Sequence, residues 1–169
     1  DANTTGDQNV AIGMDALTSN TTANDNTAVG DEALRTNTTG ASNAALGKAA
    51  LRTNTTGVSN TALGYFSLYA NTTGASNIAV GCGALCTNTE GNVNVAIGVR
   101  ALRCNIDGDQ NTAVGTTALH SNTTAFDNTA VGHQAMYWNT TGASNVAMGR
   151  DALLNNTTAS NNTAVGFSS

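Results

Sequence analysis

One spacing, of 17 residues, runs through the whole chain of 169 residues. Glycine recurs at this spacing ten times without insertion or deletion, and the repeated unit reads N-T-A-V-G-x-x-A-L-x-x-N-T-T-G-x-x. Equivalent residues of successive units form a file, named by its first member. The Gly13 file comprises Gly13, Gly30, Gly47, Gly64, Gly81, Gly98, Gly115, Gly132, Gly149 and Gly166. Residues 1–169 are therefore predicted to be one repeat domain that folds by stacking similar units.

The length of the repeat selects the fold class. A packed pair of helices needs about 33 residues, so 17 residues are too few for one. Asparagine and threonine, which occur 24 and 28 times, are also poor helix formers. The repeat predicts an all-β fold, a parallel β-solenoid (β-roll or β-helix) of about ten coils, with two or three short strands in each. Coils stacked about 4.8 Å apart would form a rod about 48 Å long.

Two asparagine files and the glycine file are expected to hold the coils together. Side-chain amides repeated in register can bond from coil to coil, which would satisfy polar groups at the turns. The N-T-T triplet of the Asn3 file is also an N-glycosylation acceptor sequence. Asn88 and Asn105 keep the asparagine without that sequence, which favours the ladder. Each glycine is expected to adopt a positive φ or to allow close approach at a bend. The asparagines assigned to the ladders are Asn9, Asn20, Asn37, Asn54 and Asn71.

The strand N-T-A-V-G has small or apolar residues on both faces. Side chains alternate across a strand, so the Val10 and Ile12 files share one face and the Ala11 file lies on the other. We expect the apolar Ile12 file and the Leu17 file to fill a thin core. A strand that is apolar on both sides favours packing of one face on a neighbouring chain. The alternative is that alanine is a small, β-compatible residue on an exposed face.

Four positions in each unit vary freely, one, two, five and six residues after the glycine. Free variation indicates outward side chains, so any partner would meet these positions. The candidates for contact with a partner are the aromatic residues Tyr65, Phe66, Tyr69, Tyr137 and Trp138.

The cysteines have the spacing C-x3-C-x17-C, which matches no common zinc signature. Cys86 and Cys104 lie in adjacent coils, at positions of the repeat that differ by one residue. Free thiols, a disulfide between Cys86 and Cys104, and a metal site are the three alternatives, with free thiols preferred. The acidic residues form no file, so structural calcium is not expected. No nucleophile is set beside a base, and we expect neither a metal, nor a cofactor, nor enzyme activity.

Charge and hydropathy exclude two classes of partner. With a net charge of −5 and six lysines and arginines, the chain lacks the basic surface of a nucleic-acid-binding protein. No run of about 18 apolar residues is present, so no membrane insertion is expected. The paired threonines of the Thr4 and Thr5 files are also the pattern of an ice-binding surface, although Ile106, Glu90 and Asp107 interrupt them.

The A-V-G or A-I-G motif followed by x-x-A, as in Asn94–Gly98, resembles the head repeats of YadA-like trimeric autotransporter adhesins and repeats of phage tail fibres. The resemblance extends over all ten coils. It implies a left-handed parallel β-roll in a trimer that is displayed outside the cell for adhesion. The coil is longer than that of the adhesin head, and the N-T-T-G element is not part of the head motif.

The function expected from these features is an extracellular or cell-surface fibre or adhesive shaft that is not an enzyme. Its main partner would be a second copy of itself, with a cell-surface or glycan receptor as a further partner. The alternative is a ligand-binding solenoid, either ice-binding or glycan-binding. No capping segment is recognisable near Asp1 or Ser169, and the length is one short of ten 17-residue units. Head-to-tail stacking of copies is therefore expected, and excision from a longer array is the other interpretation.

Overall fold

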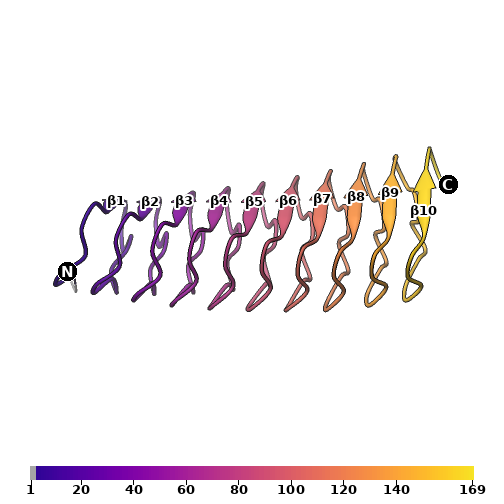
Figure 1. The fold of residues 1–169 in the computed structure, drawn as a ribbon. Helices are drawn as coiled ribbons and strands as arrows, with labels where there is room; N and C mark the ends of the chain where they lie inside the picture. Colours follow the sequence, from indigo (N-terminus) through magenta and orange to yellow (C-terminus); the bar gives the residue numbers. More distant parts are fainter. Residues whose placement is uncertain (1–2) are drawn as a thin grey trace.

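The computed structural model describes residues 3–169 as a rod of stacked coils (Figure 1). Each repeat contributes one strand of three residues, and all ten strands pair in parallel in chain order. The register is offset by one repeat, so that Ala11 pairs with Ala28 and Ala28 with Ala45. The strands are β1 (Val10–Ile12), β2 (Thr27–Val29), β3 (Ala44–Leu46), β4 (Thr61–Leu63), β5 (Ile78–Val80), β6 (Val95–Ile97), β7 (Thr112–Val114), β8 (Thr129–Val131), β9 (Val146–Met148) and β10 (Thr163–Val165).

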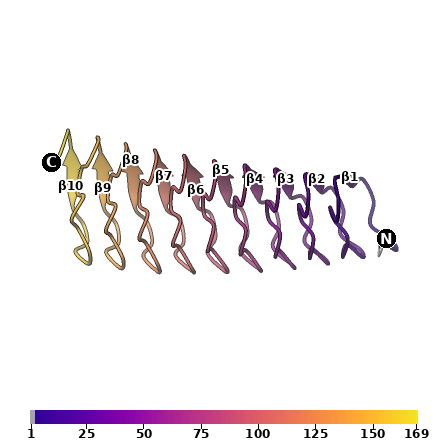
Figure 2. The same ribbon diagram turned by 180° about the vertical axis from the view of Figure 1, so that it is seen from behind.

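The predicted fold class, an all-β parallel solenoid, is confirmed. The strands lie along one side of the rod and turns form the rest of every coil, as both views show (Figures 1 and 2). Within the described part of the chain no helix is long and apolar enough to cross a bilayer.

The expectation of two or three strands in each coil is wrong, because left-handed residues divide the coil. Besides the Gly13 file, the Gln8, Asp15 and Leu17 files have a positive φ, from 48° at Leu153 to 65° at Gly83. A residue with positive φ lies outside the β region and ends a strand. Strand pairing is confined to the three residues before each glycine of the Gly13 file, and the stretch that follows the Leu17 file, such as residues 35–41, forms turns and bends.

Alanine and leucine, and not the residues of the Ile12 file, fill the core. Ala28, Ala33 and Leu34 have no exposed surface, and their equivalents in the inner coils are buried in the same way. The prediction for the Leu17 file is confirmed. The prediction for the Ile12 file is wrong, since Ile12 is 60% exposed and Leu46 is 49% exposed. The leucines and asparagines occupy the interior, and each strand directs its alanine side chain toward them.

Both asparagine ladders are present and buried. In the Asn3 file, Asn71 Nδ2 donates to Asn54 Oδ1 (2.8 Å) and to the Gly74 carbonyl (2.9 Å). In the Asn9 file, the backbone N–H of Asn77 donates to Asn60 Oδ1 (3.0 Å), and Asn77 Nδ2 donates to a carbonyl of the next coil. From Asn20 to Asn139 every asparagine of the Asn3 file is buried. The N-T-T asparagines are therefore parts of the ladder in the folded chain.

The glycines of the Gly13 file satisfy both predicted requirements at once. Gly98 has a φ of +133°, a conformation that side chains rarely adopt. A Cβ added there would lie 2.5 Å from the carbonyl oxygen of Gly115 in the next coil. Adjacent coils thus touch backbone to backbone at this corner.

Candidate functional site

The outward side chains of β1–β10 form one continuous surface, called the outer strand face. It consists of two parallel rows, the Val10 file and the Ile12 file. Neighbouring residues in a row are about 4.8 Å apart, and the rows are about 7 Å apart. The members of the Ile12 file are Ile12, Val29, Leu46, Leu63, Val80, Ile97, Val114, Val131, Met148 and Val165.

The outer strand face is apolar and has no charged residue. The Ile12 file holds only Ile, Val, Leu and Met, and the Val10 file mixes threonine with Val, Ile and Ala. A shallow hollow of about 340 Å³ lies around Ala44, where the side chain is smallest. The alternative that alanine occupies the exposed side of the strand is wrong, since Ala28 is fully buried. The strand covers the core with one face and leaves an apolar face open to solvent.

The two threonine files differ in exposure. Thr55 Oγ1 donates to the Thr72 carbonyl of the next coil (3.0 Å), and residues of the Thr4 file are mostly half-buried. Thr56 and Thr73 of the Thr5 file are exposed. Only one threonine file therefore faces water, and Glu90 and Asp107 interrupt it.

The four variable positions form the variable face, on which Ala49 and Gly83 are buried and the other residues are exposed or half-buried. Tyr65 and Trp138 are exposed, while Phe66, Tyr69 and Tyr137 are half-buried. Two separate aromatic clusters result, one of Tyr65, Phe66 and Tyr69 and the other around Tyr137. The structure thus places all five predicted partner-facing residues on this face but does not bring them into one group.

In the first cluster the Phe66 ring stacks on Tyr69, with centroids 4.6 Å apart. Arg52 Nη1 donates to the Tyr69 hydroxyl (3.0 Å), and its guanidinium lies over the Tyr69 ring. Arg52 also pairs with Glu32 at 2.8 Å. Tyr69 is therefore already engaged by the chain itself, and Tyr65 is the most accessible ring of this cluster.

In the second cluster His120 stacks on Tyr137 with centroids 4.8 Å apart and an interplanar angle of 4°. Trp138 meets Tyr137 edge-on at 4.7 Å. Burial lowers the pKa of His120, and the nearby Arg103 and Arg100 lower it further. The ring is consequently neutral at pH 7. His120 lies five residues after Gly115, at one of the four variable positions, so the sequence predicts an outward side chain. It does not predict this stack, because stacking depends on the angle at which each coil presents its side chain.

The three cysteines are free thiols, and the disulfide considered between Cys86 and Cys104 is not formed. Cys82 is exposed, whereas Cys86 and Cys104 are half-buried. Burial raises the pKa of the Cys86 thiol.

We expect iodoacetamide to alkylate Cys82 well before Cys86 at pH 8. The thiolate is the reacting form, and Cys86 is both less accessible and less ionised than an ordinary cysteine. Peptide mass spectrometry over a time course measures the order, and chain unfolded in urea should lose the difference. Faster reaction at Cys86 in the folded chain would contradict the placement of these side chains.

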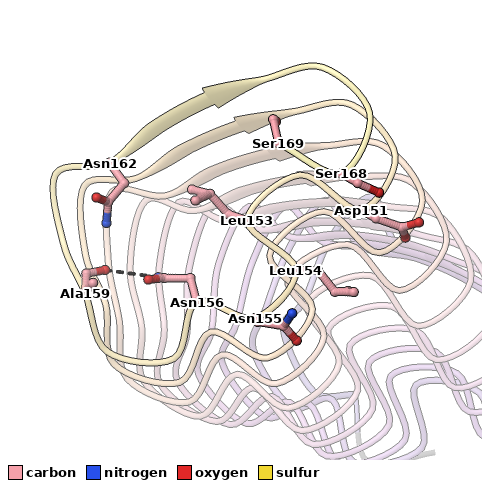
Figure 3. A pocket seen from close by; sticks show the side chains of 9 residues that line it. All are labelled: Asp151, Leu153, Leu154, Asn155, Asn156, Ala159, Asn162, Ser168 and Ser169. Carbon is pink, nitrogen blue, oxygen red and sulfur yellow. Dashed lines mark hydrogen bonds between the residues drawn. The ribbon is translucent and has the colours of Figure 1, made fainter.

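A hollow of about 470 Å³ lies at the C-terminal end of the rod (Figure 3). Leu153 and Asn156 point into the space that the coil encloses beneath its strand, and Asn156 Nδ2 donates to the Ala159 carbonyl. These files are covered by the following coil elsewhere in the rod. The hollow is therefore the open end of the core at the last coil. No set of reactive side chains converges on it.

No family model, curated protein or solved structure matches the chain. Among residues 3–169, no three histidine, cysteine, aspartate or glutamate side chains form a group that could hold a metal ion. The features that remain for function are the outer strand face and the clusters on the variable face.

Proposed function

We propose that the chain is a structural, non-enzymatic segment of a fibre or adhesive shaft, and that its copies associate side by side through the outer strand face. The observation that carries this proposal is the apolar row of the Ile12 file, which is exposed or half-buried along all ten strands. Monomeric soluble proteins seldom leave a continuous apolar surface of several hundred Å² uncovered.

The size of the face fits a modest interface between copies. Ten strands at about 4.8 Å and two rows about 7 Å apart span roughly 340 Å² on each copy. Two copies packed face to face would bury about 700 Å² in all, which is the size of a weak or transient interface. Because the rows repeat with the same spacing in every copy, side chains of one face can interdigitate with those of another along the whole rod.

The interior suits a shaft, since two buried asparagine ladders and a backbone contact at the Gly13 file repeat in almost every coil. The extracellular or cell-surface location belongs to the proposal and is supported by the resemblance to adhesin-head and tail-fibre repeats. Head-to-tail stacking of copies stays a prediction.

The proposal is tested by charging the outer strand face. We expect the wild-type chain to associate with rising concentration, and the double variant Leu63→Lys/Val114→Lys to remain monomeric. Buried lysines without partners would oppose contact between faces. Sedimentation velocity gives the oligomeric state, and negative-stain images distinguish rods side by side from rods end to end.

The matched control is Thr56→Lys/Thr124→Lys, which adds the same charge to the exposed Thr5 file. It should associate as the wild type does. A wild-type chain that stays monomeric at every concentration, or equal loss of association in both double variants, would overturn the assignment of the face.

An ice-binding surface is the second candidate, and the flat, regular row of outward residues favours it. Thr27, Thr61, Thr112, Thr129 and Thr163 all lie on the outer strand face. Self-association is preferred because the Ile12 file beside them holds bulky apolar side chains of unequal length. An ice-recrystallisation assay on the monomeric fraction separates the two, and inhibition there would favour ice binding.

A further inference from the structure

The middle of the variable face carries two arginines without an acidic partner. Arg100 and Arg103 are exposed, and neither forms an ion pair within residues 3–169. The acidic residues of this face lie in coils nearer the two ends of the rod, at Asp15, Asp31, Glu32 and Asp151. Glu32 and Asp31 are already paired with arginine and lysine, at 2.8 to 2.9 Å. A local positive charge therefore stands out on a chain whose net charge is −5.

Planar side chains continue from these arginines along the rod. Arg103, His120 and Tyr137 occupy one file in successive coils, about 4.8 Å apart. Trp138 stands beside Tyr137 and is 51% exposed. Backbone bonds fix these neighbours, since Cys104 N–H donates to the His120 carbonyl and Ser121 N–H donates to the Tyr137 carbonyl, both at 3.0 Å. The backbone that carries these side chains is therefore fixed before any ligand arrives.

We propose that Arg100, Arg103, Tyr137 and Trp138 form a binding site for a short acidic oligosaccharide. Guanidinium groups bind carboxylate or sulfate oxygens with two parallel hydrogen bonds. The apolar C–H face of a pyranose ring packs on an exposed aromatic ring, and Trp138 provides the largest one in the group. Neutral His120, between the arginine and the tyrosine, can bond a sugar hydroxyl.

Other acidic partners match these residues less well. An acidic peptide would pair with the arginines but leave the Trp138 ring without a flat apolar partner. A nucleic acid would bring a long row of phosphates against a chain of net charge −5. Two arginines instead fit one or two acid groups. The site lies apart from the outer strand face, so its test does not depend on the self-association proposed above.

The experiment is a calorimetric or NMR titration of the full chain with trigalacturonate. The probes for comparison are maltotriose, which is neutral, triglutamate, which has three carboxylates without a sugar ring, and a thymidine trinucleotide. We expect trigalacturonate to bind at least tenfold more tightly than each of the other three. Equal binding of triglutamate or of the trinucleotide, or preference for maltotriose, would overturn the proposal.

Variants locate the site. Arg103→Ala and Trp138→Ala should each weaken trigalacturonate binding about tenfold or more. Phe126→Ala is the matched control, since Phe126 is also 51% exposed but lies outside the variable face. It should bind as the wild type does. A melting temperature equal to that of the wild type shows that a variant is folded. Wild-type affinity for trigalacturonate in folded Arg103→Ala and Trp138→Ala would overturn the proposal.

Discussion

Replacing Gly98 with alanine is expected to destabilise the solenoid by about 4 kcal/mol or more, among the largest effects of any single substitution. The added methyl group would meet the Gly115 carbonyl carbon and oxygen at 2.6 and 2.5 Å. Both are backbone atoms of the next coil and cannot rotate away. The φ of +133° adds strain for any residue with a side chain. The midpoint of urea denaturation, followed by circular dichroism, measures the change.

Gly74→Ala is the control for this prediction. A methyl group at Gly74 would also lie close to its neighbours, 2.5 Å from Asn71 Oδ1 and from the Gly91 carbonyl oxygen. The same file nevertheless holds Ala23, Ala125 and Ala159, so coils of this solenoid can make the small shift that alanine needs. We expect a cost of about 1 kcal/mol. If both variants lost the same stability, the backbone contact at the Gly13 file would not be the dominant cause.

Replacing Asn71 with alanine should cost about 1–3 kcal/mol, since one buried polar group would be left without a partner. The side chain is fully buried, donates to Asn54 Oδ1 and the Gly74 carbonyl, and accepts from Asn88 Nδ2 at 2.9 Å. Its removal would leave Asn54 Oδ1 without a partner, while the Gly74 carbonyl still accepts from Asn60 Nδ2 and Asn88 Nδ2 still donates to the Gly91 carbonyl. Denaturation of the variant and the wild type under the same conditions gives the difference.

Thr73→Ala provides the comparison within the same coil. Thr73 is exposed and lies two residues after Asn71, and we expect its replacement to change stability by less than about 0.5 kcal/mol. Similar losses from the two substitutions would contradict the assignment of inside and outside in this turn.

The period and the asparagine files were enough to predict the fold class and both ladders. An uninterrupted repeat of 17 residues allows few ways of stacking the coils. An asparagine repeated in register can form the hydrogen bonds of its side-chain amide only with the adjacent coils. The conformation of Gly98 was predictable for a similar reason, because glycine is required wherever φ is positive and a backbone approaches closely.

Which strand face is inside could not be predicted. Alternation shows that Ala28 and Val29 point to opposite sides, but it does not say which side is buried when both are apolar. The decision comes from the rest of the coil, where Leu34 and the asparagines occupy the interior and leave room only for a methyl group. The left-handed conformation of Leu34, with a φ of 49°, was equally hidden, because leucine rarely adopts it.

The candidate sites were predictable only as a set of outward positions. Free variation predicted outward side chains for Tyr137 and Trp138, of which Trp138 is exposed and Tyr137 is half-buried. It could not show that His120 stacks on Tyr137 or that Tyr69 is held by Arg52. Those contacts depend on the rotation between coils and on side-chain rotamers, which the residue types do not specify.

Register pairing at a fixed offset has a consequence for how such a protein can change size. Because every inner coil offers its neighbours the same ladder amides, glycine contact and strand edge, one coil is interchangeable with another. Gain or loss of a whole repeat by unequal recombination would therefore leave the contacts between neighbouring coils the same in kind. The rod would lengthen or shorten in steps of about 4.8 Å. The number of repeats that the gene encodes would therefore set the length of the rod.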